Sequence, residues 1–173
     1  KNPLPSSAIS RRRFLQHTTL GAAAFQIVPA GLFGASGGAS ANSKLNVAGI
    51  GVGSQGGADV DAVAGHGQNI VALCDVDHKY AGKQFAKYPN ARPFKDYRVM
   101  FDRMGEHLDA VIIGTPDHTH AVMAMEAMRR GKHVYCEKPL THSVAEARLL
   151  MAAARQFKVK TQLGNQGHSS DSI

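Results

Sequence analysis

Three glycines, Gly51, Gly53 and Gly56, form the pattern G-x-G-x-x-G, which can hold the phosphates of a dinucleotide. The first permits a tight turn, the second lets the backbone approach a pyrophosphate, and the third lets a helix pack closely on a sheet. Free N–H groups and the dipole at the start of that helix favour the phosphates. Asp75 follows about twenty residues later, where a carboxylate binds the adenosine ribose hydroxyls.

The surroundings of the glycines decide whether the pattern has this meaning. An apolar run, Leu45 to Ile50, precedes them, a short helical stretch follows, and a second apolar run, Ile70 to Cys74, ends on Asp75. This order is the strand–helix–strand unit that dinucleotide binding needs. The alternative is a glycine-rich structural turn, with Asp75 as an ordinary helix cap.

Six apolar runs alternate with helical patterns along the rest of the chain. We predict strands at 45–50, 70–74, 92–94, 109–114, 133–136 and 160–163. The predicted fold class is therefore α/β, a Rossmann-type doubly wound parallel sheet with strand order 3-2-1-4-5-6. Helices are expected at 78–88, 96–104, from an Asp117 N-cap to Arg130, and after a capping box at Ser143 and Glu146.

Helical spacing also predicts which faces are buried. In the helix before Gly131, Val122, Met125 and Met128 share a face, and Glu126 and Arg130 are spaced for an ion pair. In the last helix, the residues predicted to share a core face are Val144, Ala147, Met151 and Ala154.

Three predicted strands end in polar segments at the edge where such sheets bind ligands. These are 115–120 (TPDHTH), 137–139 (EKP) and 164–168 (GNQGH). Together with the glycine pattern and Asp75, this set and order resembles the glucose–fructose oxidoreductase/inositol dehydrogenase family (Gfo/Idh/MocA), over residues 44–168. The EKP segment at this point in the fold is the most specific part of the resemblance.

The resemblance implies the role of each matching position. Glu137 would bind the nicotinamide ribose, and Lys138 would lie near the nicotinamide and the reacting hydroxyl as the catalytic residue. The implied cofactor-binding positions are Gly51, Gly53, Ser54, Gln55, Gly56, Asp75, Thr115, Pro116, His120, Glu137, Lys138, Asn165 and Gln166. The family's second domain, with further substrate contacts and usually a catalytic His, would lie outside this chain, so we expect an inactive N-terminal part of a homo-oligomeric protein.

We therefore predict an NAD-dependent oxidoreductase acting on a sugar, polyol or sugar derivative. Hydride would leave a carbinol carbon for the nicotinamide while a base takes the hydroxyl proton. One alternative is an NAD-dependent glycoside hydrolase that oxidises a sugar only transiently, and another is a non-catalytic dinucleotide-binding module. NAD is expected rather than NADP, because Asp75 would repel a 2′-phosphate, although Lys79 lies close by.

The first residues predict export rather than structure. Residues 10–16 (SRRRFLQ) closely resemble the twin-arginine signal, and an interrupted apolar stretch and Ala39-Ser40-Ala41 follow. We assign 1–41 to a twin-arginine signal peptide, 42–168 to the NAD-binding domain and 169–173 to the start of a connection. The export machinery would then be a partner and the periplasm the destination, whereas the alternative is a disordered basic tail or nucleic-acid arm.

The remaining composition argues against several other classes. The formal charge of +7 falls to about +3 without residues 1–41, and the other basic residues are interleaved with acids, so nucleic acid is not an expected partner. No stretch after Asn42 could span a membrane. His118 and His120, next to Asp117, are spaced i, i+2 and so do not share a helix face, and no metal is expected. Cys74 and Cys136 end strands about 14 Å apart, too far for a disulfide.

Overall fold

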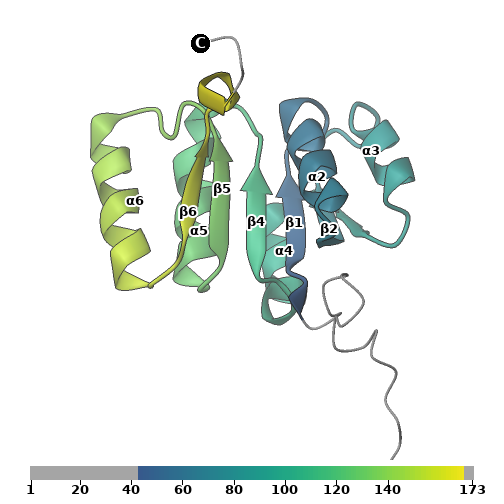
Figure 1. Ribbon diagram of the computed structural model, residues 1–173, viewed down its shortest axis with the longest axis horizontal. Coiled ribbons are helices and arrows are strands. Elements are labelled where there is room, and N and C mark those ends of the chain that lie inside the picture. Colours follow the sequence, from purple (N-terminus) through teal and green to yellow (C-terminus); the bar gives the residue numbers. More distant parts are fainter. Residues whose placement is uncertain (1–42, 170–173) are drawn as a thin grey trace, which may run out of the picture. The chain divides into compact units, whose positions relative to one another are not determined.

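A computed structural model describes residues 43–169, and the predicted signal peptide, residues 1–41, lies outside the described residues. The described chain forms a six-stranded sheet of order β3-β2-β1-β4-β5-β6, with neighbouring strands parallel (Figure 1). The strands are β1 (Asn46–Ile50), β2 (Asn69–Cys74), β3 (Arg92–Phe94), β4 (Ala110–Ile113), β5 (His133–Glu137) and β6 (Thr161–Gly164). The predicted fold class and strand order are confirmed.

The connecting helices form two layers with separate cores. They are α2 (Gln55–Gly65), α3 (Gly82–Lys87), α4 (Tyr97–Met104), α5 (His120–Arg129) and α6 (Val144–Gln156). Val60 of α2 and Phe85 of α3 pack on one face of the sheet, and Phe101 of α4, Met128 of α5 and Leu150 of α6 pack on the other. Right-handed crossovers from a central β1 require this division, because the chain reverses direction across the sheet between β3 and β4.

The central strands align their carboxyl ends at one edge. Ile50, at the end of β1, stands beside Cys74 of β2 and Ile113 of β4, and all three side chains are buried. Parallel strands covered on both faces need such continuous apolar runs. The loops that follow these strands therefore meet at the same edge, as the sequence predicted.

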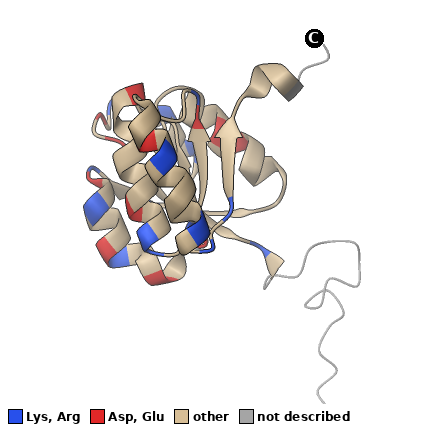
Figure 2. Cartoon of the chain, turned by 90° about the vertical axis from the view of Figure 1, so that its left-hand side faces the viewer, with Lys and Arg blue, Asp and Glu red and all other residues tan. Residues whose placement is uncertain are grey.

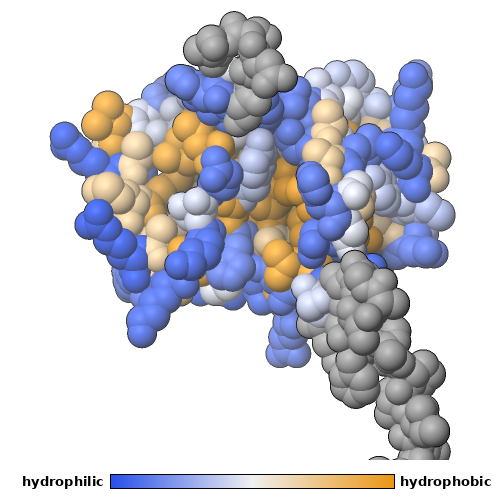
Figure 3. Space-filling model, viewed as in Figure 1, coloured by the Kyte–Doolittle hydropathy of each residue, from blue (hydrophilic) through white to orange (hydrophobic). Residues whose placement is uncertain are grey.

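On the face of the sheet where α2 packs, no helix of the described residues covers β5 and β6. In Figure 1, β5 and β6 lie in front of α5, and Figure 3 shows apolar surface on the same side. A shallow hollow there is lined by residues including Val47, Ile112, Tyr135 and Gln162. Among the helices of residues 43–169, none combines the length and apolar character needed to cross a bilayer.

Two helices begin later than predicted. α3 starts at Gly82 rather than His78, because the Asp77 carboxylate accepts the backbone N–H groups of Lys79 and Tyr80 and holds a turn there. α5 starts at His120, and the predicted Asp117 N-cap is wrong. Asp117 begins a short 3-10 turn instead, in which Thr119 donates its hydroxyl to the Pro116 carbonyl oxygen, 2.7 Å away.

The predicted helix faces are correct only in part. Met128 is buried and Met125 packs against the core, but Val122 is 55% exposed. In α6 the buried residues are Leu150 and Ala153, whereas Val144 and Met151 of the predicted face are exposed. α6 lies at the end of the layer, so it buries a narrower stripe than a central helix does.

Local signals at the helix ends are confirmed. The α6 capping box forms between Ser143 and Glu146, and Gly131 takes a φ of 73° after α5. The Arg130 guanidinium and the Glu126 carboxylate, four positions apart, lie 2.7 Å from each other.

Candidate cofactor site

The glycine loop leaves β1 through a backbone conformation that favours glycine. Gly51 has a φ of 77°, and its N–H donates to the Cys74 carbonyl oxygen at 2.8 Å. A Cβ at Gly51 would also lie 2.7 Å from the backbone nitrogen of Thr115. The turn therefore needs glycine for its dihedral angle and for the close approach of the β4 loop.

The start of α2 is seated directly on the sheet. A Cβ at Gly56 would collide with the Gly51 carbonyl oxygen, and a Cβ at Gly114, after β4, would collide with the Gly56 Cα. This contact explains why the third glycine of the pattern is needed. It brings the N-terminus of α2, which has no acidic residue in its first turn, to the carboxyl edge of the sheet.

Asp75 clamps the glycine loop. Its Oδ2 accepts hydrogen bonds from the backbone N–H groups of Val52, at 2.9 Å, and Gly53, at 3.0 Å. Its Oδ1 accepts from the N–H of Asp77 at 3.0 Å. A carboxylate has about four lone-pair sites, so these three bonds leave room for a ligand hydroxyl.

A cavity of about 520 Å³ opens beside this loop, a volume suited to a small-molecule ligand. Six of the predicted site residues line it: Gly51, Gly53, Ser54, Asp75, Thr115 and Pro116. Lys95, Tyr97 and Met123 also line it, and the Tyr80 ring lies against Gly53, so a Cβ there would collide with it. These four side chains were not predicted, because only the fold brings them to the glycine loop.

The cavity and the loop fit a dinucleotide. Gly51, Gly53 and Ser54 line the cavity, and the N-terminus of α2, where free N–H groups favour phosphates, lies at the same edge. Gln55 was predicted to contact the pyrophosphate. Its side-chain amide donates to Asp59 at 3.1 Å.

His120 joins two of the strand-end segments. Its side chain is 1% exposed, with Nε2 lying 2.7 Å from the Thr115 carbonyl oxygen and Nδ1 lying 2.7 Å from the Pro139 carbonyl oxygen. The ring thus lies behind the cavity wall rather than in it. It fixes the loop after β4 against the segment that carries Lys138.

Two buried carboxyl groups, Glu137 and Asp59, form a polar cluster beside α2 with the half-buried Tyr135 and the exposed Gln166. Glu137 is 4% exposed, and its Oε1 accepts from the Gln166 amide and from the Tyr135 hydroxyl. The same Gln166 amide lies 3.3 Å from Oδ1 of Asp59, which is 8% exposed. A Cβ at Gly164 would lie 2.8 Å from the Glu137 Cδ, so the glycine leaves room for the carboxylate.

Burial and like charge determine the titration of this cluster. Burial raises the pKa of Asp59, a hydrogen bond from Gln55 opposes the rise, and the neighbouring Glu137 carboxylate adds to it. Burial, together with the neighbouring Asp59 and Glu137 carboxylates, raises the pKa of Tyr135 to about 12. The phenol therefore keeps its proton and can donate it to Glu137.

Asp59 was not predicted as a site residue, although one signal for it existed. It lies three residues after Gly56, so helical spacing places it on the side of α2 that faces the sheet.

Lys138 and Asn165 are exposed at the same edge. The Lys138 backbone N–H donates to the Gly164 carbonyl oxygen at 3.3 Å, while its ammonium makes no ion pair within residues 43–169. Among the predicted site residues, some therefore line the cavity, Glu137 and Gln166 belong to the polar cluster, and Lys138 and Asn165 are exposed at the sheet edge.

Cys74, at the end of β2, lines the cavity as a free thiol. Cys74 and Cys136 are free and buried, which confirms the prediction of free thiols, and burial raises the pKa of each to about 12. In the part of the chain that is described, no group of three His, Cys, Asp or Glu side chains is placed to hold a metal ion.

Comparison with known proteins gives one family. A family model described as "Oxidoreductase family, NAD-binding Rossmann fold" matches residues 45–165. The chain is 33% identical over 115 residues to an inositol 2-dehydrogenase from Rubrobacter xylanophilus, which covers 65% of this chain and 32% of that protein. The chain spans about a third of the length of the first curated relatives that it matches.

Solved structures agree with this match. Myo-inositol 2-dehydrogenase from Lactobacillus plantarum superposes with a TM-score of 0.67 and 26% identity, over 75% of this chain and 38% of that one. Scyllo-inositol dehydrogenase from Lactobacillus casei, solved with bound NAD(H) and scyllo-inositol, gives a TM-score of 0.65 and 25% identity, with the same coverage. The described domain is an NAD-binding Rossmann fold.

Proposed function

This chain belongs to the Gfo/Idh/MocA oxidoreductase family, and from that premise we propose that the whole protein is an NAD-dependent dehydrogenase of a polyol or sugar. The observation that carries the proposal is the meeting of the glycine-loop cavity with the Glu137–Lys138 segment at one sheet edge, through His120. The relatives named as inositol dehydrogenases support a polyhydroxylated substrate.

The cofactor contacts follow from the loop geometry. The backbone around Gly51, Gly53 and Ser54, with the N-terminus of α2, would hold the pyrophosphate, and Asp75 would hold the adenosine ribose while it fixes the loop. Bound NAD supplies the acceptor for the hydride of the substrate. Asp75 favours NAD over NADP, because its carboxylate would repel a 2′-phosphate. Equal or tighter binding of NADP in titrations would contradict this preference.

Lys138 is the residue that we assign to proton transfer. Its exposed ammonium follows the buried Glu137, so it can reach a substrate at the sheet edge while the backbone stays fixed to Gly164. A lysine beside the reacting hydroxyl can take or share the proton that the alcohol loses on oxidation. Glu137 would bind the nicotinamide ribose.

Product analysis tests the proposal. We expect the full-length protein, given NAD and a panel of inositols and sugars, to form NADH and an equal amount of a ketone or lactone. Release of an aglycone from a glycoside without net NADH would instead indicate the glycoside hydrolase alternative, which the comparisons do not support. Cofactor binding with no turnover of any panel member would indicate the binding module.

We also propose that the protein is exported through the twin-arginine pathway and works as a homo-oligomer. An exported enzyme has no NAD pool from which to replace a lost cofactor, so it would hold the dinucleotide with a sub-micromolar Kd, more than about 8 kcal/mol of binding free energy. We expect periplasmic protein to carry bound dinucleotide. Cofactor-free periplasmic protein, or export that persists after Arg11 and Arg12 are both changed to Lys, would contradict this.

A further inference from the structure

Asp59 and Glu137 form a buried carboxyl pair that the proposed chemistry does not explain. Asp59 comes from α2 and Glu137 from the end of β5, and each is more than nine-tenths buried. Oδ1 of Asp59 accepts from the amides of Gln55 and Gln166, but Oδ2 is buried without any hydrogen-bond partner. An ionised carboxylate with one bare oxygen is costly in such a place.

No basic group balances this pair. The side chains that face it are Tyr135 on β5, Gln55 on α2 and Gln166 after β6, all of them neutral. None of the ion pairs within residues 43–169 includes Asp59 or Glu137. Two negative charges here would repel each other without a cation to offset them.

The hydrogen-bond inventory leaves Asp59 Oδ2 without a donor. The two hydrogens of the Gln166 amide lie against Asp59 Oδ1, Glu137 Oε1 and the Tyr135 hydroxyl oxygen, and the Gln55 amide also donates to Asp59 Oδ1. The single Tyr135 hydroxyl hydrogen is directed to Glu137. One more proton, carried by a carboxyl group, would supply the missing donor.

We propose that Asp59 keeps a proton at neutral pH and shares it with Glu137, so that the pair carries one negative charge and Asp59 positions Glu137. The functional part of this inference rests on the proposed role of Glu137 as the ligand of the nicotinamide ribose. The raised pKa of Asp59, caused first by burial, agrees with the geometry. A neutral Asp59 also removes one negative charge from the N-terminal half of α2.

The pair should make cofactor binding depend on pH. As the pH rises, the shared proton is lost, the two carboxylates repel each other, and Glu137 moves from its position. NAD affinity of the wild-type protein should therefore fall on the alkaline side. Asp59→Asn mimics the protonated acid in shape and hydrogen bonding, so it should bind NAD within about twofold of wild type at neutral pH, with the alkaline fall removed.

The experiment compares four variants of the full-length protein by NAD titration across pH. Asp59→Ala removes the shared donor and should weaken NAD binding at least tenfold, and Glu137→Gln should weaken it as well. Asp61→Asn is the matched control, because Asp61 lies two residues further along α2 and is paired with Lys87 at 2.7 Å. Its pH profile should follow the wild type.

Infrared spectroscopy provides a second readout without cofactor. At neutral pH the wild-type protein should show the carbonyl band of a protonated carboxyl, and Asp59→Asn should lack it. Absence of that band in the wild type, or an alkaline fall in NAD affinity that persists in Asp59→Asn, would overturn the inference. NAD binding unchanged in Glu137→Gln while the band is present would instead remove the proposed role of Glu137 and leave the shared proton standing.

Discussion

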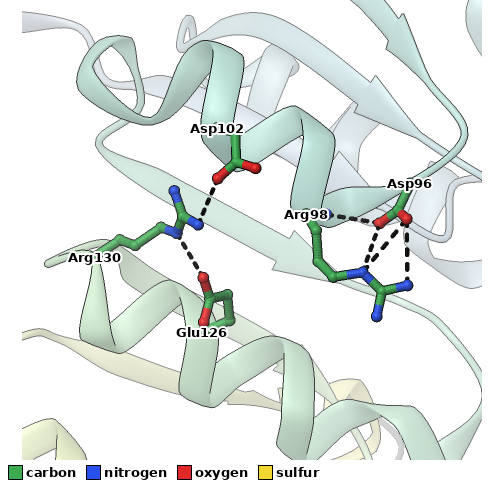
Figure 4. Close-up of polar contacts among 5 residues, drawn as sticks. All are labelled: Asp96, Arg98, Asp102, Glu126 and Arg130. Atoms are coloured by element: carbon green, nitrogen blue, oxygen red, sulfur yellow. Dashed lines mark hydrogen bonds and ion pairs between the residues drawn. The ribbon is translucent and has the colours of Figure 1, made fainter.

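In one region of this molecule, acidic side chains form ion pairs with arginines, and in another, two acidic side chains are buried without a basic partner among the described residues. Between α4 and α5, the Arg130 guanidinium lies 2.7 Å from Asp102 and 2.7 Å from Glu126, and the Asp96 carboxylate accepts from Arg98 (Figure 4). At the carboxyl edge of the sheet, Asp59 and Glu137 lie together with no cation.

The ion-paired residues lie on the surface, where charge favours solubility and stability, whereas the buried carboxyl pair lies at the proposed cofactor site. Basic and acidic residues alternate over the helices that face the viewer in Figure 2, and such exposed pairs contribute little individually. Buried like charges lower stability, so a fold keeps them where their chemistry is needed. The cofactor edge of this domain is such a place.

The largest predicted effect is a loss of turnover on substitution of Lys138, at the cofactor edge. Lys138→Ala in the full-length enzyme should lower kcat by about a hundredfold or more, the usual scale for a positioned proton-transfer group. NAD affinity should change little, because the loop and Asp75 contacts lie elsewhere. Steady-state kinetics with Arg130→Ala as the control, which should keep its kcat, measures this. A Lys138→Ala enzyme with near-normal turnover would take the lysine out of the mechanism.

The next effect concerns how tightly each region is packed. Gly114→Ala should lower the free energy of unfolding by about 1–3 kcal/mol, because the new Cβ collides with the Gly56 backbone at the start of α2. Gly105→Ala is the matched control, since a Cβ there would have only the Arg130 guanidinium, at 4.0 Å, near it. Urea titrations of both variants compare the regions, and equal losses would show that the cofactor edge is no more tightly packed.

Much of the fold and part of the candidate site could be predicted from the sequence. The strands and their order follow from short apolar runs alternating with helical patterns, and the glycine loop follows from spacing and context. Thr115 follows β4, His120 is the first residue of α5, and Glu137 is the last residue of β5, so all three lie at the predicted edge. These features depend on contacts that are close in sequence or fixed by the alternation of strands and helices.

The remaining features depend on contacts between distant segments. Gln166 meets Asp59 from 107 positions away, and no local pattern signals that approach. In α6, the spacing predicted a core face that included Val144 and Met151, but packing on the sheet buried Leu150 and Ala153 instead. Asp117 had a capping residue's chemistry, but the turn held by Thr119 moved the helix start beyond it.

A third prediction is that the two regions respond to pH with opposite signs. The folded state holds the Asp59 proton more tightly than the unfolded chain, so this group's contribution to stability falls as the pH rises above the ordinary carboxyl pKa. Hydrogen bonds from the backbone and side chain of Arg98 lower the pKa of Asp96, so its contribution is lost as the pH falls.

Denaturant titrations from about pH 2 to about pH 8 separate these contributions. Asp59→Asn should remove a decline in stability toward higher pH, and Asp96→Asn should remove a decline toward lower pH. If Asp59→Asn left the slope of stability against pH unchanged over this range, the pKa of Asp59 would be the same in the folded and unfolded chains.

The smallest effect is expected where the charges are already paired. Arg130→Ala should lower the free energy of unfolding by about 1 kcal/mol, because the guanidinium is partly exposed and also covers the Phe101 ring at 5.5 Å. Arg98→Ala, which breaks a more exposed pair with Asp96, should cost less than Arg130→Ala. Thermal melts at low and high salt measure both variants, and added salt should reduce both losses. A loss at Arg130 as large as that of Gly114→Ala would mean that the ion-paired layer, rather than the cofactor edge, limits the stability of the domain.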